Sequence, residues 1–276
     1  MKEEVEFLYR VLNIVQSYLQ DLILIGGFAS LLYRFHGNAA PLDIPPLITY
    51  DVDLASEGEV PIRGEKSIHK SLEEAGLKEE LLGDHEQTTV RYYPLKETNS
   101  AYYVEFLSPL LGSGTKRNGR PDLTQKIQSD LLGQKLRYLD LLTLDNWKFN
   151  TSSIPDLIGQ PDLIVRVPHP SMYIMQKILT LQKRQQNDRI KDCAYIYQTL
   201  SYFRNHMKLL AEDYEVLITK PGWKKWYSRF LSLSRELFSS PERDGSIDVP
   251  KILDNVTPEM ASAVVMNFID TCPNLK

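Results

Sequence analysis

Two aspartates, Asp51 and Asp53, interrupt an otherwise apolar segment of the sequence and are separated by Val52. Side chains of a β-strand alternate between its two faces, so residues at i and i+2 point the same way. Two carboxylates on one face repel each other unless a cation lies between them, and Mg²⁺ binds a few carboxylates together with phosphate oxygens. The spacing therefore indicates a divalent-cation site, with a solvated strand end as the structural alternative.

A third carboxylate, Glu105, lies in the apolar segment 102–107, where an unpaired charge would be costly to bury. If this segment pairs with the strand that carries Asp51 and Asp53, the three carboxylates converge on one face. Such a set can hold two metal ions about 3.5–4 Å apart, the arrangement that serves phosphoryl transfer. We therefore expect Asp51, Asp53 and Glu105 to be metal ligands and catalytic residues, with Mg²⁺ as the cofactor of a two-metal site.

A pair of glycines, Gly26 and Gly27, follows the apolar run 22–25 and precedes a segment with helical periodicity. Glycines at such a turn let the backbone approach a ligand closely, and the first amides of the following helix favour an anion such as phosphate. The pair matches neither the dinucleotide-binding GxGxxG nor a P-loop, so a tight turn without a ligand is the alternative. Near three carboxylates, this turn is where we expect the phosphates of a nucleotide.

The pattern of apolar residues predicts the elements that position these side chains. It predicts strands over 22–25, 48–54, 88–93, 102–107 and 163–167, and helices over 8–19, 28–35, 65–75, 172–185, 190–200, 223–238 and 258–270. Residues 125–142 are also predicted to be largely helical. Thr257 and Pro258 are a predicted N-cap and first helical residue. We accordingly expect a mixed α/β domain over 1–125 and a mostly helical domain over 126–276.

Composition limits the class of protein. The 276 residues are 42% apolar and 25% charged, which suits a globular protein with a sizeable core and excludes intrinsic disorder. The 32 basic and 36 acidic residues give a net charge of −4, so we do not expect the whole surface to bind nucleic acid electrostatically, although the charge is compatible with a local basic groove. Two distant cysteines and short apolar runs predict a reduced, cytoplasmic protein that does not enter a membrane.

Two further patterns are interpreted as structural. The five histidines have no zinc-ligand spacing. Trp223, Trp226 and Phe230 lie at i, i+3 and i+7, which is typical of a buried helix face rather than of a surface that stacks bases.

The segments 24–32 and 49–54, followed by Glu105, resemble the nucleotidyltransferase superfamily with the DNA-polymerase-β-like palm. The resemblance is greatest to the nucleotidyltransferase-like proteins that include toxins of abortive-infection systems. Their pattern is a GG turn with a helix, then T-x-D-x-D, then a third acidic strand. A second block, 136–139 and 165–170 followed by Lys177 and Arg184, also agrees. In this sequence the third acid is Glu, one methylene longer than the commoner Asp.

The resemblance implies an α+β fold, in which a nucleotidyltransferase-type mixed sheet flanked by helices precedes a mostly helical C-terminal domain. It implies that Gly26, Gly27 and Ser30 contact the triphosphate of an NTP. Lys177 and Arg184 are seven residues apart on one helix face, where they would clamp phosphates or the acceptor. A solvated charged helix face is the alternative for this pair.

The resemblance further implies that Asp51 and Asp53 hold both metal ions, and that Glu105 holds one and helps to deprotonate the acceptor. The expected activity is Mg²⁺-dependent transfer of a nucleoside monophosphate from an NTP to a hydroxyl of an RNA 3′ end or a protein side chain, as suits a toxin that has an antitoxin partner. One alternative is a catalytically silent domain that binds a nucleotide or a partner protein. Another is a helical interaction protein whose α/β part is only a scaffold.

Overall fold

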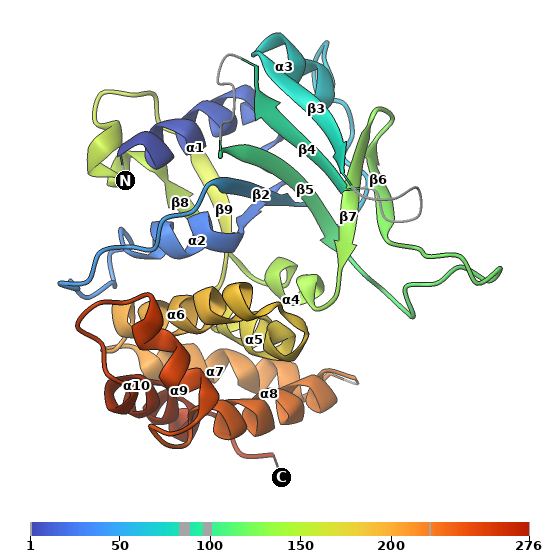
Figure 1. Ribbon diagram of the computed structural model, residues 1–276. Helices are drawn as coiled ribbons and strands as arrows, with labels where there is room; N and C mark the ends of the chain where they lie inside the picture. Colours follow the sequence, from blue (N-terminus) through green and yellow to red (C-terminus); the bar gives the residue numbers. More distant parts are fainter. Residues whose placement is uncertain (1, 83–88, 96–100, 221, 276) are drawn as a thin grey trace. The chain divides into compact units, whose positions relative to one another are not determined.

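The computed structural model describes residues 2–82, 89–95, 101–220 and 222–275 (Figure 1). The chain forms two compact units. Residues 1–32 and 48–168 make up the first unit, and residues 33–47 and 169–276 make up the second.

The first unit is built on a mixed β-sheet, to which nine strands contribute in the described part of the chain. The strands are β1 (Ile23–Ile25), β2 (Asp51–Ala55), β3 (Leu77–Leu82), β4 (Thr89–Pro94), β5 (Tyr103–Pro109), β6 (Thr124–Gln128), β7 (Leu131–Leu136), β8 (Asn146–Asn150) and β9 (Ile164–Pro168). Their order is β3-β4-β5-β2-β1-β9-β8, and the β6–β7 hairpin joins the sheet because β7 also pairs with β5.

Apolar and acidic side chains alternate along β2 and β5, which gives the centre of this sheet one apolar face. Val52 and Val104 are register partners, as are Leu54 and Phe106, and all four side chains are at most 2% exposed. Register partners on adjacent strands point to the same side of the sheet. Along each strand the direction alternates, so the residues that alternate with these four point to the opposite side. Packing of the apolar face thus leaves Asp51, Asp53 and Glu105 together on the opposite face.

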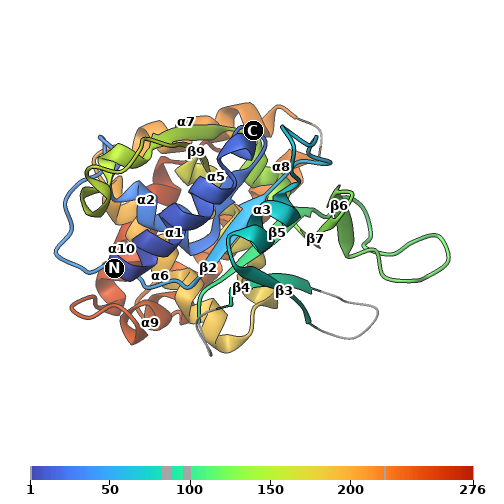
Figure 2. The same ribbon diagram turned by 90° about the horizontal axis from the view of Figure 1, so that it is seen from above.

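In the described residues, four α-helices accompany the sheet: α1 (Lys2–Ile14), α2 (Gly26–Tyr33), α3 (Ile68–Glu74) and α4 (Leu139–Thr143). Figures 1 and 2 show α1 and α3 on the same face of the sheet. The buried side of α1 carries Val5, Leu8 and Val11, all 0% exposed, as in an amphipathic helix, but the helix begins and ends earlier than the predicted 8–19. Helix α3 is capped by Ser67, whose Oγ accepts a hydrogen bond from the Lys70 amide.

The prediction of a helix over 125–142 is wrong. Residues 124–136 form the antiparallel hairpin β6–β7, and only the short α4 that follows is helical. Pairing with β5, in which Leu107 faces Gln134, stabilises β7 as a strand, a contact that no local pattern contains. Gly133 fits this packing, since an added Cβ would lie 2.5 Å from Ile127 Cδ1.

The boundary between the compact units also differs from the division that we expected after residue 125. The unit that contains the sheet extends to Pro168. The reason is strand pairing: β9 lies parallel to β1 and antiparallel to β8, so the chain returns to the same sheet after leaving it.

The second unit is helical. Its helices are α5 (Pro170–Thr180), α6 (Gln186–Tyr202), α7 (Met207–Ile218), α8 (Trp223–Phe238), α9 (Asp244–Asp248) and α10 (Pro258–Thr271). The predicted start of the last helix is confirmed, because Thr257 Oγ1 accepts a hydrogen bond from the Met260 amide and Pro258 is the first helical residue. None of the helices in the described residues is long and apolar enough to cross a membrane.

Candidate active site

The register of three adjacent strands gathers the predicted acidic residues. Strand β2 lies between β1 and β5, and Asp53 faces Ile25 on one side and Glu105 on the other. Asp51 lies two residues earlier on β2, so its side chain points to the same face. Asp53 and Glu105 are each 9% exposed, whereas Asp51 is more accessible. We call the side of the sheet that carries these three carboxylates the acidic face.

The glycine turn lies directly against Asp53. Gly26 has a φ of +67°, and a Cβ built on it would lie only 2.0 Å from Asp53 Oδ2. Gly26 and Gly27 begin helix α2, and Ser30, which is 2% exposed, follows Gly26 by one helical turn. The predicted phosphate turn and the predicted metal ligands are therefore neighbours in the structure. Glycine is required at position 26 both by the backbone conformation and by the carboxylate.

Thr49 orients the first carboxylate. Its Oγ1 donates a hydrogen bond of 2.5 Å to Asp51 Oδ1, and the threonine itself is only 2% exposed. A buried hydroxyl with a short bond restricts the rotamer of the aspartate, so Thr49 acts as a positioning residue for Asp51.

Glu105 departs from the expected arrangement because it has an ionic partner. Arg91 of β4 faces Glu105 across the antiparallel β4–β5 pair, and its Nε donates to Glu105 Oε1. No group of three His, Cys, Asp or Glu side chains in the described parts of the chain is already gathered to hold a metal ion. The three carboxylates thus share a face as expected. They do not converge on one point in this structure, in which Glu105 is paired with Arg91.

Arg91 and Tyr103 are residues of the acidic face that sequence reasoning missed. The Arg91 guanidinium carbon lies 4.2 Å from the centre of the Tyr103 ring, and Tyr103 faces Asp51 across the parallel pair. Burial raises the pKa of Tyr103, and the charges of Asp51, Glu105 and Asp53 add to the rise. The sequence did contain a signal for Arg91. A charged residue in the apolar strand 89–94 is as unusual as Glu105 is in the apolar strand 102–107.

The pKa of Glu105 is raised above its usual 4.5 chiefly by burial, although the hydrogen bond and the charge of Arg91 lower it, and the charge of Asp51 adds to the rise. The folded protein therefore holds this proton more tightly than the unfolded chain. A carboxylate with a raised pKa is a better base near neutral pH than an ordinary one.

Because Glu105 binds its proton more tightly in the folded protein, the stability of the protein should depend on pH, and Glu105→Gln should remove this dependence. As pH rises from 4.5 through the raised pKa of Glu105, metal-free wild-type protein should lose stability relative to the variant, by about 1.4 kcal/mol per pH unit between the two pKa values. Below and above that window the difference should be constant. Denaturant unfolding in EDTA from pH 4 to 8 measures it, with the exposed Glu80→Gln as control. A difference that is independent of pH would contradict the prediction.

Lys177 and Arg184, which we expected to clamp phosphates, belong to the second unit, and both bind Asp192. Lys177 Nζ donates to Asp192 Oδ1, and Arg184 Nε donates to Oδ2 at 3.1 Å. The side chains of Lys177 and Asp192 are 8% and 6% exposed, whereas that of Arg184 is 39% exposed. The Lys177 ammonium also lies 5.3 Å from the ring centre of Tyr195. These contacts make Lys177 part of a buried ion pair, and Arg184, which lies beyond the end of α5, is not on the same helix face as expected. Phosphate binding by the two residues stays a prediction.

Lys177→Met should therefore destabilise the protein. Removal of one partner from a buried ion pair leaves an uncompensated charge and costs about 3–5 kcal/mol, and we expect about 3 kcal/mol because Arg184 still neutralises Asp192. Chemical denaturation measures the change, with the exposed Lys183→Met as control. Equal stability of the two variants would show that the Lys177–Asp192 contact is not structural.

Comparison with known proteins places these features in a family. The sequence profile of a family described as Nucleotidyltransferase matches residues 8–218, which include Gly26, Asp51, Asp53, Glu105 and Lys177. Among solved structures, the chain is similar to an antigenic nucleotidyltransferase-like protein from Paracoccidioides brasiliensis. The two are 15% identical, with 83% of this chain and 92% of that chain covered and a TM-score of 0.35. No curated protein matches.

Proposed function

Since the chain belongs to the nucleotidyltransferase family, we propose that it transfers a nucleoside monophosphate from an NTP to a hydroxyl group, with Mg²⁺ bound at the acidic face. The observation that carries the proposal is the contact between Asp53 and the Gly26 turn, with Asp51 and Glu105 on the same face. This contact supports the proposal because it would bring the proposed cation site and the proposed phosphate site together. A protein side chain or an RNA 3′ end would supply the hydroxyl.

The donor set of the acidic face fits Mg²⁺. Asp51 and Asp53 offer carboxylate oxygens on one face of one strand, which suit a hard cation that also keeps water or phosphate ligands. Glu105 is a third candidate ligand, and it becomes available when its Arg91 partner exchanges to another anion. Bound Mg²⁺ would polarise the phosphoryl oxygens and neutralise charge that develops during transfer.

The residues of the chain have distinct tasks in the proposed reaction. The first amides of α2, which begins at Gly26, would bind phosphate oxygens of the NTP. Arg91, once released from Glu105, is a cation at the acidic face that can bind the triphosphate in a bidentate manner. Thr49 holds Asp51 in the rotamer that it needs.

The proposed reaction is a nucleophilic displacement at the α-phosphorus of the NTP. A bond forms between the acceptor oxygen and the α-phosphorus, and the bond from that phosphorus to the β-phosphate bridging oxygen breaks. Pyrophosphate leaves with the electron pair. Glu105, whose raised pKa suits a general base, accepts the proton of the acceptor hydroxyl.

The test is incubation of the purified protein with each α-labelled NTP, Mg²⁺, and either total cell RNA or lysate protein. The proposal predicts Mg²⁺-dependent label on one of the two acceptor pools. Stabilisation of the protein by Mg²⁺ and NTP without label on either pool would favour instead the catalytically silent domain that binds a nucleotide. Absence of both label and stabilisation would reject nucleotide chemistry at the acidic face.

A further inference from the structure

One ion pair lies inside the proposed site. Arg91 Nε donates to Glu105 Oε1, and the two side chains are 31% and 12% exposed. The pairing of β4 with β5 places Arg91 directly opposite Glu105, and its guanidinium carbon lies 4.2 Å from the centre of the Tyr103 ring. Arg91 is therefore fixed to the sheet, and its cation occupies one oxygen of a proposed metal ligand.

Glu105 requires a positive partner when it is ionised. It is 9% exposed, and loss of the partner of a buried charge is strongly destabilising, because the remaining charge is uncompensated. Glu80 faces Arg91 from its other side, on β3, but it is exposed, and exposed ion pairs contribute little to stability. The partner that satisfies both Glu105 and Arg91 is therefore the other member of the pair.

A metal ion at Glu105 would have to compete with Arg91. Mg²⁺ binds carboxylate oxygens at about 2.0–2.1 Å, and a guanidinium on the same carboxylate repels a dication at such short range. If Arg91 leaves Glu105 it needs another anion, and the other carboxylates of the acidic face, Asp51 and Asp53, are themselves proposed metal ligands. The triphosphate of an NTP brings that anion, because arginine binds phosphate oxygens in a bidentate manner.

We propose that Arg91 occupies Glu105 as a tethered cation and releases it to a metal ion only when the triphosphate of an NTP binds Arg91. The inference rests on the proposed function, since it concerns the same cation and phosphate sites. It adds an order to them: without nucleotide, Asp51 and Asp53 are open to a metal ion and Glu105 is not. Coupling of this kind changes the affinity for each ligand by the same factor, typically about 5–150-fold.

Isothermal titration calorimetry with each ligand alone tests the two halves of the exchange. Mn²⁺, as a substitute for Mg²⁺, is titrated without nucleotide. Arg91→Gln should bind it about fivefold or more tightly than wild type, because Glu105 no longer has an internal cation. The control Lys78→Gln makes the same change in net charge at an exposed residue of β3, which is two strands and at least about 10 Å from Glu105. Ionic screening acts over about 8 Å at physiological salt, so the control should gain less than about twofold.

Tripolyphosphate, the anionic part of an NTP, is titrated separately in EDTA. Glu105→Gln should bind it about fivefold or more tightly than wild type, because Arg91 has lost its ionic partner. The control Glu80→Gln removes the exposed carboxylate on the other side of Arg91. It should change the affinity for tripolyphosphate less than about twofold, because the exposed charge holds Arg91 only weakly.

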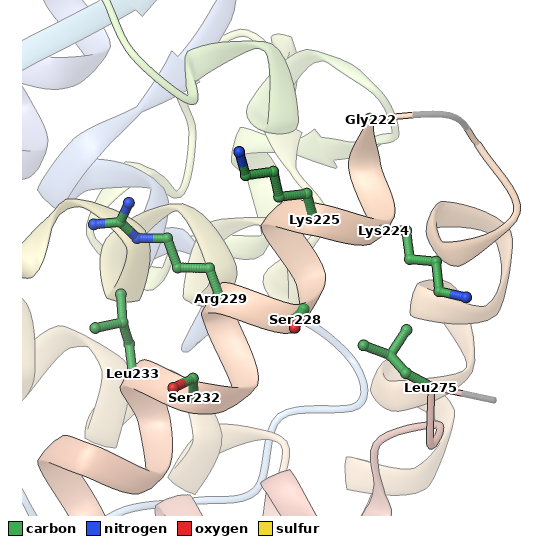
Figure 3. A pocket seen from close by; sticks show the side chains of 8 residues that line it. All are labelled: Gly222, Lys224, Lys225, Ser228, Arg229, Ser232, Leu233 and Leu275. Carbon is green, nitrogen blue, oxygen red and sulfur yellow. The ribbon is translucent and has the colours of Figure 1, made fainter.

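A second cationic surface must be separated from Arg91 in this titration. Helix α8 carries Lys224, Lys225 and Arg229 along an open groove of 720 Å³, and Figure 3 shows that Lys225 and Arg229 extend from the same side of the helix. All three residues are exposed, so they attract a polyanion of any kind. Lys225→Gln/Arg229→Gln is therefore the background in which Glu105→Gln and Glu80→Gln are compared.

Thermal unfolding verifies that each variant is folded, and the tripolyphosphate titration does not need Arg91→Gln. Tighter Mn²⁺ binding by Arg91→Gln and tighter tripolyphosphate binding by Glu105→Gln, each beyond its control, support the proposal. Equal gains in either variant and its control would overturn it, because they would reflect net charge only. Unchanged affinity in either variant would also overturn it, whereas Mn²⁺ binding by wild type would leave the proposed cation site in place. No Mn²⁺ binding by any of the proteins would reject that site as well.

Discussion

Asp53→Asn is expected to abolish nucleotidyl transfer, with a loss on the order of 10³-fold or more. Asp53 is 9% exposed and lies between the Gly26 turn and Glu105, so a water molecule from bulk solvent does not readily take the place of its carboxylate. In other enzymes, loss of a single hydrogen-bond donor that stabilises transition-state charge lowers the rate about 10²–10³-fold. Loss of a metal ligand removes more than one stabilising interaction, so its effect should be at least as large. Label transfer from α-labelled NTP, followed over time for both proteins, measures the effect.

The same variant should also lose its response to ligand. Wild-type protein should be stabilised by Mg²⁺ with NTP, by about 2.7 kcal/mol when the ligand is at a hundred times its Kd. Asp53→Asn should show little of this gain, while its unfolding in EDTA stays close to that of wild type, because the amide has the shape of the carboxylate. The exposed Asp156→Asn is the matched control and should behave as wild type. If Asp53→Asn transferred nucleotide at the wild-type rate, the acidic face would not be the site of the reaction.

Gly26→Ala is expected to lower both stability and activity. The alanine Cβ would lie 2.0 Å from Asp53 Oδ2, in a backbone conformation with φ of +67° that L-residues rarely adopt. Left-handed backbone costs about 1–2 kcal/mol, and forced overlap in a packed region costs about 1–3 kcal/mol, so we expect a total loss of about 3 kcal/mol. Because the methyl group displaces Asp53, transfer should also fail in the protein that remains folded.

Gly58→Ala is the control for Gly26→Ala. No atom lies within 4 Å of a Cβ at position 58, and Gly58 has no positive φ in the left-handed region. Denaturant unfolding and label transfer should therefore be near wild type for this variant. If Gly26→Ala were as stable and active as Gly58→Ala, the glycine turn would have no role in holding Asp53 against the phosphate site.

Some of the site could be predicted because strand alternation is a local property. Asp51 and Asp53 share a face wherever their strand lies, and Val52 and Leu54, which alternate with them, predict that this strand is buried on its other face. The Gly26–Gly27 turn was predictable for the same reason, since a strand that ends at glycines before a helix is a short-range pattern. The family profile, which matches residues 8–218, confirms the superfamily that these motifs indicated.

Other features depend on contacts between distant parts of the chain. The hairpin 124–136 is a strand pair because β7 adds to β5, although its residues alone indicate a helix. The same cause moves the boundary between the compact units to Pro168, since β9 pairs with β1 across more than a hundred residues of sequence.

The sequence by itself determined which residues we propose for the chemistry: two aspartates at i and i+2, a third acid in an apolar strand, and a glycine turn before a helix. Only the tertiary structure decided what these residues touch. It put Asp53 against Gly26 and turned Glu105 to Arg91, fourteen residues away on a neighbouring strand. It likewise left Trp223 and Trp226 partly exposed where the helical period predicted core. The physical reason is that periodicity determines the direction of a side chain, whereas its partners depend on strand register and helix packing, which involve the whole chain.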